Sequence, residues 1–558
     1  MVEKIWKIVP ADQQRVDMLA DATGLSPALC RALVARGIDT VEQARTFLNP
    51  DLSSLHDPFL MKDMDNAVAR LKEAIRSREP ILIYGDFDAD GVTATALLVK
   101  GLDDLGATVS YCVPDRLQEG YGLNEDRIRA AHEDGVKLIV CVDNGIGSHD
   151  DVALANELGI DVIITDHHEP RGDTLPPATA VLDPKRADCP YPFRDLAGVG
   201  VAFKLYQALT GDITGLDLVA LGTIADIVPL LDENRVLVRA GLEEINARRR
   251  RGIEQLIEVS GLHDTMLSAQ NVAFQLAPRI NAGGRVGTAH VGVQLLLTNS
   301  VQIASEIARA LDQENVARRS IEEGIVEQAD AVLARTFSPS QRVIVLADPG
   351  WHPGVIGIAA SRIVDRYYRP TALIALSDTV GKGSARSLRA FDIHAALESC
   401  SDLLDTFGGH RLAAGFTIKQ DRIDELRDRL NRVATEIMAD DALVPELKID
   451  GIVALDEIDD RLVAQLGGFR PFGAGNPRPV FACQGVESVG SISVIRGSHI
   501  KFTVRQNDAW RGVIGFGMAD IEPAVRTAGT FDIAFAPRLS RWAERERIQL
   551  LLKDFKAG

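Results

Sequence analysis

Acidic and imidazole side chains directly follow three apolar runs of the sequence. The runs cover residues 81–84, 138–142 and 162–165. The side chains that follow them are Asp86, Asp88 and Asp90, then Asp143, and then Asp166, His167 and His168. Carboxylates packed together repel one another and resist ionising together, and a bound divalent cation removes that cost. These residue types therefore predict a metal site with oxygen ligands and one or two imidazoles.

A site of this composition suits Mn²⁺ or Mg²⁺, and the imidazoles favour Mn²⁺. Two such ions about 3.5–4 Å apart can stabilise the attacking and leaving oxygens of a phosphoryl hydrolysis. Asp226, which follows the apolar run 218–225, is a fourth acid that could complete the site. An isolated aspartate after a strand is more often a helix cap or a turn residue. Three such strand ends together favour the metal site over that interpretation.

Short apolar runs alternate with helix-length segments between Pro80 and Thr165, a pattern that predicts βαβ units and a parallel sheet. Ligands of open parallel sheets bind beyond the carboxyl ends of the strands. We therefore expect the three acidic segments to meet at one edge of this sheet, although they are far apart in the sequence.

The other parts of the chain show different patterns. Residues 1–75 and 195–335 are predicted to be mainly helical, with one long helix over about 303–333. A second α/β segment begins at Val343, and short β-like runs after residue 450 fit a small barrel. The predicted fold class is therefore α/β with a C-terminal β-barrel.

The composition restricts the class of protein. The net charge of −18 over 558 residues argues mildly against a nucleic-acid partner, because phosphate binding needs basic patches. Carboxylates that hold metals contribute to this charge, however, and a strand-binding surface can be local. The six cysteines are scattered without a C-x-x-C pair, which is typical of reduced thiols in a cytoplasm. No membrane partner is expected, since no apolar run reaches about 18 residues.

Two glycine-containing segments of the second α/β part are candidates for phosphate binding. Gly383-Ser384-Ala385-Arg386-Ser387 combines hydroxyls with a guanidinium, and Gly408-Gly409-His410 lets backbone amides approach an anion closely. A turn and a surface charge are the alternative interpretation. Near the C-terminal end, Arg541 and Trp542 pair a cation with an aromatic ring, as single-strand-binding folds do.

The three acidic segments and Asp226 are similar, in order and spacing, to the four motifs of the DHH phosphoesterase superfamily. Within it, the chain resembles the RecJ family over nearly its whole length. The segments that carry this second resemblance are Pro114-x-Arg116 with Gly120-Tyr121-Gly122, Arg279 to Arg285, Trp351 to Gly357, and Pro471 to Pro477. The superfamily's pyrophosphatases carry a histidine where Tyr84 stands, which argues against that branch.

The resemblance implies a domain organisation. A helical N-terminal segment, 1–75, packs on a DHH catalytic domain with a parallel sheet, 76–230. A helical connector, 231–337, leads to a DHH-associated substrate-binding domain, 338–440, which closes over the substrate from across the metals. An OB-like nucleic-acid-binding barrel occupies 448–558.

The same resemblance distributes roles among the candidate residues. The expected metal ligands are Asp88, Asp90, Asp143, His167 and Asp226. Asp86 is a further ligand or positions the metal-bound water, and His168 contacts the phosphate or transfers a proton to the leaving oxygen. The expected substrate-binding residues are Arg116, Tyr121, Arg279, Ser384, Arg386, Gly408, Gly409, His410, Arg541 and Trp542. Tyr121 is equally compatible with a packed core position.

By resemblance, the expected function is metal-dependent hydrolysis of single-stranded DNA by an exonuclease, 5′ to 3′, in DNA repair and recombination. A single-strand-binding protein or a helicase is the candidate protein partner. The first alternative is a DHH-family phosphodiesterase of short oligonucleotides or cyclic dinucleotides, which would need only the two α/β parts. The second is a non-catalytic replication scaffold, which the intact carboxylate set disfavours.

Overall fold

The computed structural model describes residues 4–114, 119–120, 122–170, 172, 174–286, 289–542 and 545–557, and side chains are not described at 285–286, 541–542 and 545–546. The chain forms two compact units. One unit, here named the catalytic unit because it contains the catalytic domain that the resemblance implies, comprises Pro50–Ile321 with Pro471–Pro477. The second unit comprises Met1–Asn49, Glu322–Arg470 and Arg478–Gly558. Among the described residues, no helix is both long and apolar enough to cross a membrane.

A five-stranded parallel sheet forms the centre of the catalytic unit, with the strand order β3-β2-β4-β5-β6. The strands are β2 (Pro80–Tyr84), β3 (Thr108–Cys112), β4 (Leu138–Val142), β5 (Asp161–Thr165) and β6 (Ala180–Leu182). Alternate residues face opposite sides of a strand. Ile81 and Ile83 accordingly pack in one core, whereas Leu82 and Tyr84 pack in the other.

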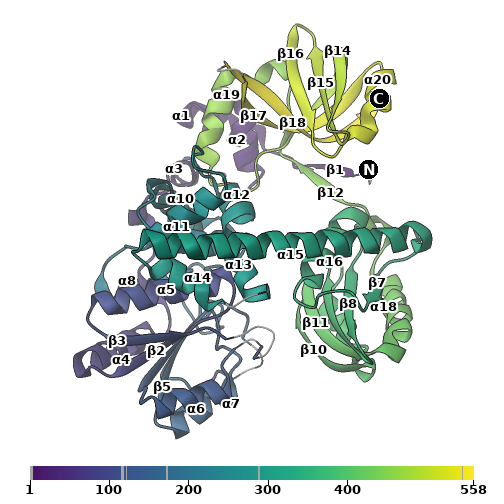
Figure 1. Ribbon diagram of the computed structural model, residues 1–558. Helices are drawn as coiled ribbons and strands as arrows, with labels where there is room; N and C mark the ends of the chain where they lie inside the picture. Colours follow the sequence, from purple (N-terminus) through teal and green to yellow (C-terminus); the bar gives the residue numbers. More distant parts are fainter. Residues whose placement is uncertain are drawn as a thin grey trace. The chain divides into compact units, whose positions relative to one another are not determined.

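Helices cover both faces of this sheet (Figure 1). On one face lie α4 (Met64–Ser77), α5 (Ala89–Asp104) and α8 (Gly198–Thr210), and on the other lie α6 (Glu125–Glu133) and α7 (His149–Glu157). The expectation of a parallel α/β sheet is therefore confirmed. The short strand β6 and the pairing of its residues with β5 were not anticipated from the sequence.

The rest of the catalytic unit is helical. Its helices are α9 (Leu216–Ala225), α10 (Asp232–Ala247), α11 (Arg251–Val259), α12 (Ala269–Asn271), a π-helical turn (Val272–Leu276), α13 (Ala277–Val286) and α14 (His290–Leu297). The expected long helix is α15 (Val301–Thr336), a continuous helix of 36 residues that belongs to both units (Figure 1). Its length agrees with the near absence of glycine and proline in this stretch.

The second unit contains a five-stranded sheet and a barrel. The sheet has the order β10-β11-β9-β8-β7, formed by β7 (Ile344–Asp348), β8 (Thr371–Ser377), β9 (Val380–Arg386), β10 (Leu404–His410) and β11 (Ala413–Lys419). It packs with α16 (Ile356–Tyr367), α17 (Ile393–Glu398) and α18 (Ile423–Ile437).

The barrel has the order β13-β14-β15-β16-β18-β17 and closes through a β14–β17 pairing, which confirms the predicted C-terminal barrel. Its strands are β13 (Gly451–Ile452), β14 (Phe481–Ile495), β15 (His499–Gln506), β16 (Ala509–Gly515), β17 (Phe531–Trp542) and β18 (Arg545–Ala557).

The N-terminal segment is divided between the two units. Residues from Pro50 onward belong to the catalytic unit, whereas the residues before it belong to the second unit. There β1 (Ile5–Ile8) pairs in parallel with β12 (Glu446–Ile449), and Trp6 Nε1 donates a hydrogen bond to Asp554 of β18 at 2.6 Å. The 1–75 segment is thus not one structural piece, because its first strand finds its partner more than 400 residues away in the sequence.

Candidate metal centre

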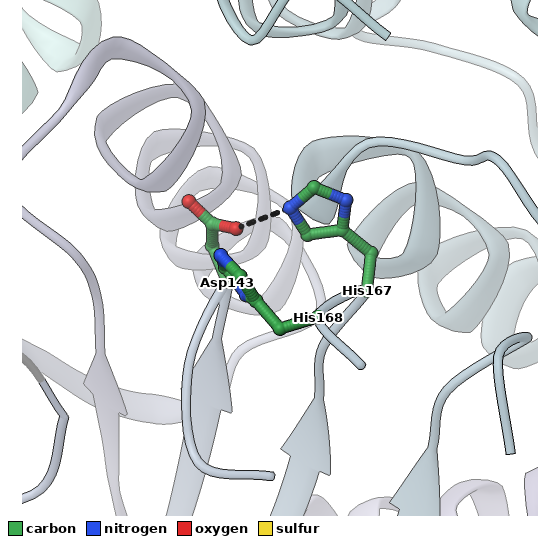
Figure 2. A group of neighbouring side chains, drawn as sticks. All are labelled: Asp143, His167 and His168. Atoms are coloured by element: carbon green, nitrogen blue, oxygen red, sulfur yellow. Dashed lines mark ion pairs between the residues drawn. The ribbon is translucent and has the colours of Figure 1, made fainter. Parts of the chain in front are cut away.

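The three acidic segments meet at the carboxyl ends of β2, β4 and β5. Three overlapping groups of side chains have possible ligand atoms within 4.8 Å of one another: Asp86, Asp88 and Asp143; Asp90, His167 and Asp226; and Asp143, His167 and His168. Asp143 and His167 each belong to two groups, and Figure 2 shows them facing each other beside His168. The arrangement places seven potential ligands in a continuous cluster at the sheet edge.

His167 lies at the centre of this cluster. Its Nε2 atom is 3.2 Å from Asp143 Oδ1, 3.7 Å from Asp226 Oδ2 and 4.0 Å from Asp90 Oδ2. Burial, followed by the charge of His168, lowers the pKa of His167 to about 3. The imidazole is therefore neutral at physiological pH, which is the form that binds metals.

Burial and mutual repulsion favour the protonated form of the carboxylates in this cluster. Burial, and then Asp90 and its acidic neighbours, raise the pKa of Asp143 well above its ordinary value. Burial and Asp88 raise the pKa of Asp90 to about 7, and burial with Asp90 raises that of Asp226 to about 8. Buried acids that repel one another in this way are stabilised in their charged form by cations. The donor set therefore fits bound divalent metal.

The segment Asp143-Asn144-Gly145 is shaped by its contacts with neighbouring strands. Asp143 adopts a left-handed backbone conformation with φ 64°, which is uncommon for a residue other than glycine. Asn144 Nδ2 donates to the carbonyl oxygens of Tyr84, at 3.2 Å, and Val142, at 2.9 Å, and so joins the ends of β2 and β4. Asp143 is thereby directed into the cluster from a fixed turn.

Asp90 is positioned by the first turn of α8. The backbone N–H of Gly198 donates to Asp90 Oδ2 at 2.7 Å, and that of Val199 donates to Oδ1 at 2.9 Å. A Cβ atom at Gly198 would lie 2.4 Å from Asp143 Oδ1, so only glycine fits there. Sequence reasoning missed this segment, although a Gly-x-Gly pair opening an apolar helix was a possible signal.

The Asp86-to-Asp90 loop is held by α13. Asp88 Oδ1 accepts the N–H groups of Asp90 at 2.9 Å and Gly91 at 3.2 Å, so Asp88 caps α5 as well as joining the cluster. Asn281 Oδ1 accepts the N–H of Ala89 at 2.7 Å. Asn281 lies in the Arg279-to-Arg285 motif, but its contact with the acidic loop could not be read from the motif.

Asp166 does not join the ligand groups and instead orients His168. The Nδ1–H of His168 donates to Asp166 Oδ1 at 2.7 Å, and Ile146 N–H donates to Oδ2 at 2.9 Å. Burial alone would lower the pKa of His168, but the hydrogen bond and charge of Asp166 raise it to about 9. His168 is therefore a cation beside the carboxylate cluster.

Four of the five predicted phosphate-binding residues of the second unit, all but Gly409, lie on one face of its sheet. Gly408 and Ser384 both pair with Gly415 of the central strand β11, and His410 and Arg386 both pair with Ala413. Paired residues of antiparallel strands share a face. Arg386 also donates to Ser384 Oγ at 3.2 Å. Gly409, with φ 140°, occupies a conformation that favours glycine.

The remaining predicted substrate contacts are placed differently. Arg279 is only 8 % exposed and forms an ion pair with Asp312 of α15 at 2.8 Å. Arg116 and Tyr121 lie outside the described residues. The backbones of Arg541 and Trp542 end β17, but their side chains also lie outside the described part of the chain.

The fold and the cluster define a phosphoesterase of the DHH type. Family models match in three places: the DHH family N-terminal domain at residues 80–223, the DHHA1 domain at 340–436 and the RecJ OB domain at 449–554. The first of these contains the strands that end in the acidic cluster.

Comparisons with proteins that match over most of this chain identify the family more closely. The chain is 40 % identical over 555 residues to the single-stranded-DNA-specific exonuclease RecJ of Bacillus subtilis (strain 168), covering 98 % of this chain and 70 % of that protein. It is 38 % identical over 497 residues to the protein of the same name from Escherichia coli (strain K12), covering 84 % and 85 %. A crystal structure of RecJ from Thermus thermophilus in complex with Mn²⁺ matches with a TM-score of 0.86 and 31 % identity over 99 % of this chain and 80 % of that one. This chain belongs to the RecJ family.

Proposed function

We propose that this protein is a metal-dependent exonuclease that hydrolyses phosphodiester bonds of single-stranded DNA. The observation that carries the proposal is the meeting of Asp143, His167 and the Asp86-to-Asp90 loop at one sheet edge, in a chain of the RecJ family. RecJ proteins of known structure bind Mn²⁺ or Mg²⁺. Two such ions, Mn²⁺ preferred, are the proposed cofactors here.

The proposed ligands are Asp88, Asp90, Asp143, His167 and Asp226. Asp143 and His167 each belong to two of the three groups, which supports placing them between two ions. When bound, the ions supply an activated water and neutralise charge on the phosphate. Asp86, which shares a group with Asp88 and Asp143, either completes the ligand set or accepts a hydrogen bond from the attacking water.

The proposed role of His168 is to donate a proton to a phosphate oxygen or to the leaving oxygen. Asp166 engages Nδ1, so the Nε2–H is the edge that can be directed at the substrate. A histidine that stays protonated near neutral pH is suited to this acid role. Asp166 acts through His168 and is a positioning residue.

Strand binding is proposed for the sheet face shared by Ser384, Arg386, Gly408 and His410, together with the adjoining backbone of Gly409, where backbone amides and a guanidinium can bind a phosphate. On the barrel, Phe516 is half exposed and the Arg538 guanidinium lies 5.6 Å from its ring centroid. This pair has the cation-plus-aromatic character of single-strand-binding surfaces. The roles of Arg116, Tyr121, Arg279, Arg541 and Trp542 stay predictions, and a strand contact by Arg279 would have to share its partner Asp312.

The function is tested with end-labelled single-stranded DNA, Mn²⁺ and the Asp143→Ala variant. We expect nucleotide release by the wild-type protein, none after chelation, and none by the variant. Exposed Asp264→Ala is the control and should retain full activity. Release of a 5′ label before a 3′ label would support 5′-to-3′ polarity. Faster cleavage of cyclic dinucleotides would favour the small-substrate alternative, and absence of any hydrolysis would favour the scaffold. A single-strand-binding protein or helicase as partner, and a cytoplasmic location, stay predictions.

A further inference from the structure

The loop that follows Asp226 is held in a strained backbone conformation. Ile227, a β-branched residue, has φ 64°, and Asp232 at the far end of the loop has φ 44°. Both values lie in the left-handed region that side chains other than glycine rarely adopt. The Ile227 side chain is 73 % exposed, so its own packing does not impose this conformation. Such strain persists only where the surrounding structure over-determines it.

A turn far away in the sequence supplies much of that support. Residues Pro471–Pro477, here named the 471–477 turn, belong to the catalytic unit although the residues on both sides of the turn belong to the second unit. The N–H of Leu230 donates to the carbonyl of Ala474 at 2.8 Å. From the other side, Asn234 Nδ2 donates to the carbonyl of Pro229 at 3.0 Å. The loop is thus bonded at two successive residues.

The 471–477 turn is itself rigidly built. Gly473 and Asn476 exchange backbone hydrogen bonds of 3.0 and 3.2 Å, and the buried Asn476 side chain donates to the carbonyl of Pro471 at 2.8 Å. Gly475 has φ 68°, and a Cβ atom there would lie 2.9 Å from Pro229 Cβ. The turn therefore approaches the loop so closely that a single methyl group has no room.

Asp226 is the candidate ligand that depends most on this loop. It lies at the C-terminal end of α9 and its side chain is one quarter exposed, whereas those of Asp90 and Asp143 are buried. Asp90 is held by the N–H groups of α8, and Asp143 follows a strand end. The direction of the Asp226 carboxylate toward His167 is set by α9 before it and by the bonded loop after it.

We propose that the 471–477 turn is a positioning element for Asp226, with Gly475 as its critical residue. By holding residues 227–231 in their strained path, the turn keeps the Asp226 carboxylate beside His167 and so raises the affinity of the site for metal. This inference rests on the proposed function, because it takes Asp226 to be a metal ligand. It assigns to the segment that precedes the barrel a role in the metal site.

The test compares Gly475→Ala with Gly261→Ala. Both glycines lie in the catalytic unit and have nearly the same φ, 68° and 69°, so the backbone strain is matched. Only the methyl at 475 meets another atom, since nothing lies within 4 Å of a Cβ at 261. Mn²⁺ binding is measured by calorimetric titration without DNA, and thermal unfolding is measured in chelator.

We expect Gly475→Ala to weaken Mn²⁺ binding about 10- to 100-fold, as changes behind metal ligands commonly do, and Gly261→Ala to bind like the wild type. Gly473→Ala is the milder variant, because its methyl meets only the flexible end of Leu230 at 2.6 Å. Weakened binding in whichever of the two turn variants folds supports the proposal. Wild-type binding in folded Gly475→Ala overturns it, and where Gly475→Ala does not fold, wild-type binding in folded Gly473→Ala overturns it.

Asp226→Asn separates this inference from the proposed function. If Asp226→Asn binds Mn²⁺ like the wild type, Asp226 is not a ligand, and both the ligand assignment and the inference fail. If Asp226→Asn weakens binding while folded Gly475→Ala does not, the ligand assignment stands and only the role of the 471–477 turn is rejected.

Discussion

Asp166 Oδ1 lies 2.7 Å from His168 Nδ1, and the aspartate is completely buried while the histidine remains partly exposed. Asp166 belongs to none of the three groups of potential ligands among the described residues, yet its hydrogen bond fixes the orientation of the His168 ring.

The Asp166–His168 pair predicts how the free energy of unfolding depends on pH when no metal is bound. The pKa of His168 is raised to about 9 in the folded protein from an ordinary value of 6.5. Its contribution to folding is therefore complete below about pH 6.5 and is lost as the pH rises through 9. Asp166→Asn should reduce the free energy of unfolding most near pH 5 to 6 and progressively less toward pH 9, as urea unfolding in chelator would measure. A pH-independent difference would contradict the assignment.

The carboxylate cluster predicts a loss of stability in the same direction but over a lower pH range, and its reversal by metal. Asp90 and Asp226 have pKa values raised to about 7 and 8, so the folded state binds protons that the unfolded state has released. Without metal, their contribution to stability falls as the pH rises from about 4 through 8. Mn²⁺ at one fixed concentration, about 100 times its dissociation constant at pH 8, should add about 2.7 kcal/mol at pH 8 and less at pH 6, where protons compete for the carboxylates, and so raise Tm more at pH 8. An equal Tm increase at both pH values would argue against a carboxylate site.

Gly198→Ala should weaken the metal site without altering any ligand. Its methyl group would lie 2.4 Å from Asp143 Oδ1 and displace that carboxylate. We expect a loss in Mn²⁺ affinity of about 10- to 100-fold, with lower turnover at limiting Mn²⁺. Gly200→Ala in the same helix turn is the control, because its methyl meets only Leu196, at 3.3 Å. If both variants behave alike, the effect belongs to the helix and not to Asp143.

Arg386→Ala should lower kcat while Mn²⁺ affinity stays unchanged. The guanidinium is proposed to act on the phosphate, and Arg386→Lys should restore little, because lysine lacks the bidentate fork. Steady-state rates on labelled single strands and Mn²⁺ titration distinguish the two effects. Arg422→Ala removes a surface arginine of the same unit that pairs with Glu425, and it should have no effect. Loss of Mn²⁺ binding in Arg386→Ala would refute a role confined to the phosphate.

Phe516→Ala should raise KM for long single strands and leave kcat nearly unchanged. Stacking of a base on an aromatic side chain contributes about 1–3 kcal/mol, so a loss of roughly 5- to 150-fold in affinity is expected. Trp542→Ala is predicted to behave in the same way. Binding measured by fluorescence anisotropy at one stated salt concentration tests both variants. Unaltered affinity in both would exclude Phe516 and Trp542 from strand binding.

The local pattern was sufficient to predict the parallel sheet and the meeting of the acidic segments at one of its edges. Apolar runs of four or five residues alternating with helices define β2, β4 and β5, and parallel strands bring their carboxyl ends to one edge. Asp86, Asp143 and His167 could therefore be assigned to one site before any contact was known. The 36-residue helix α15 was equally readable, because helix-breaking residues are almost absent from it.

Only the tertiary structure decided what holds those side chains in place. The bonds from Gly198 to Asp90, from Ala89 to Asn281 and from Leu230 to Ala474 join residues about 100 to 240 positions apart. The tertiary structure also shows that Arg279 pairs with Asp312, that the 471–477 turn belongs to the catalytic unit, and that the N-terminal segment is divided between the two units. Periodicity and residue type report the local conformation and which face of an element is buried, because these depend on neighbours in the chain. Long-range hydrogen bonds, and positions where only glycine leaves enough room, depend on where separate elements meet, and packing decides this.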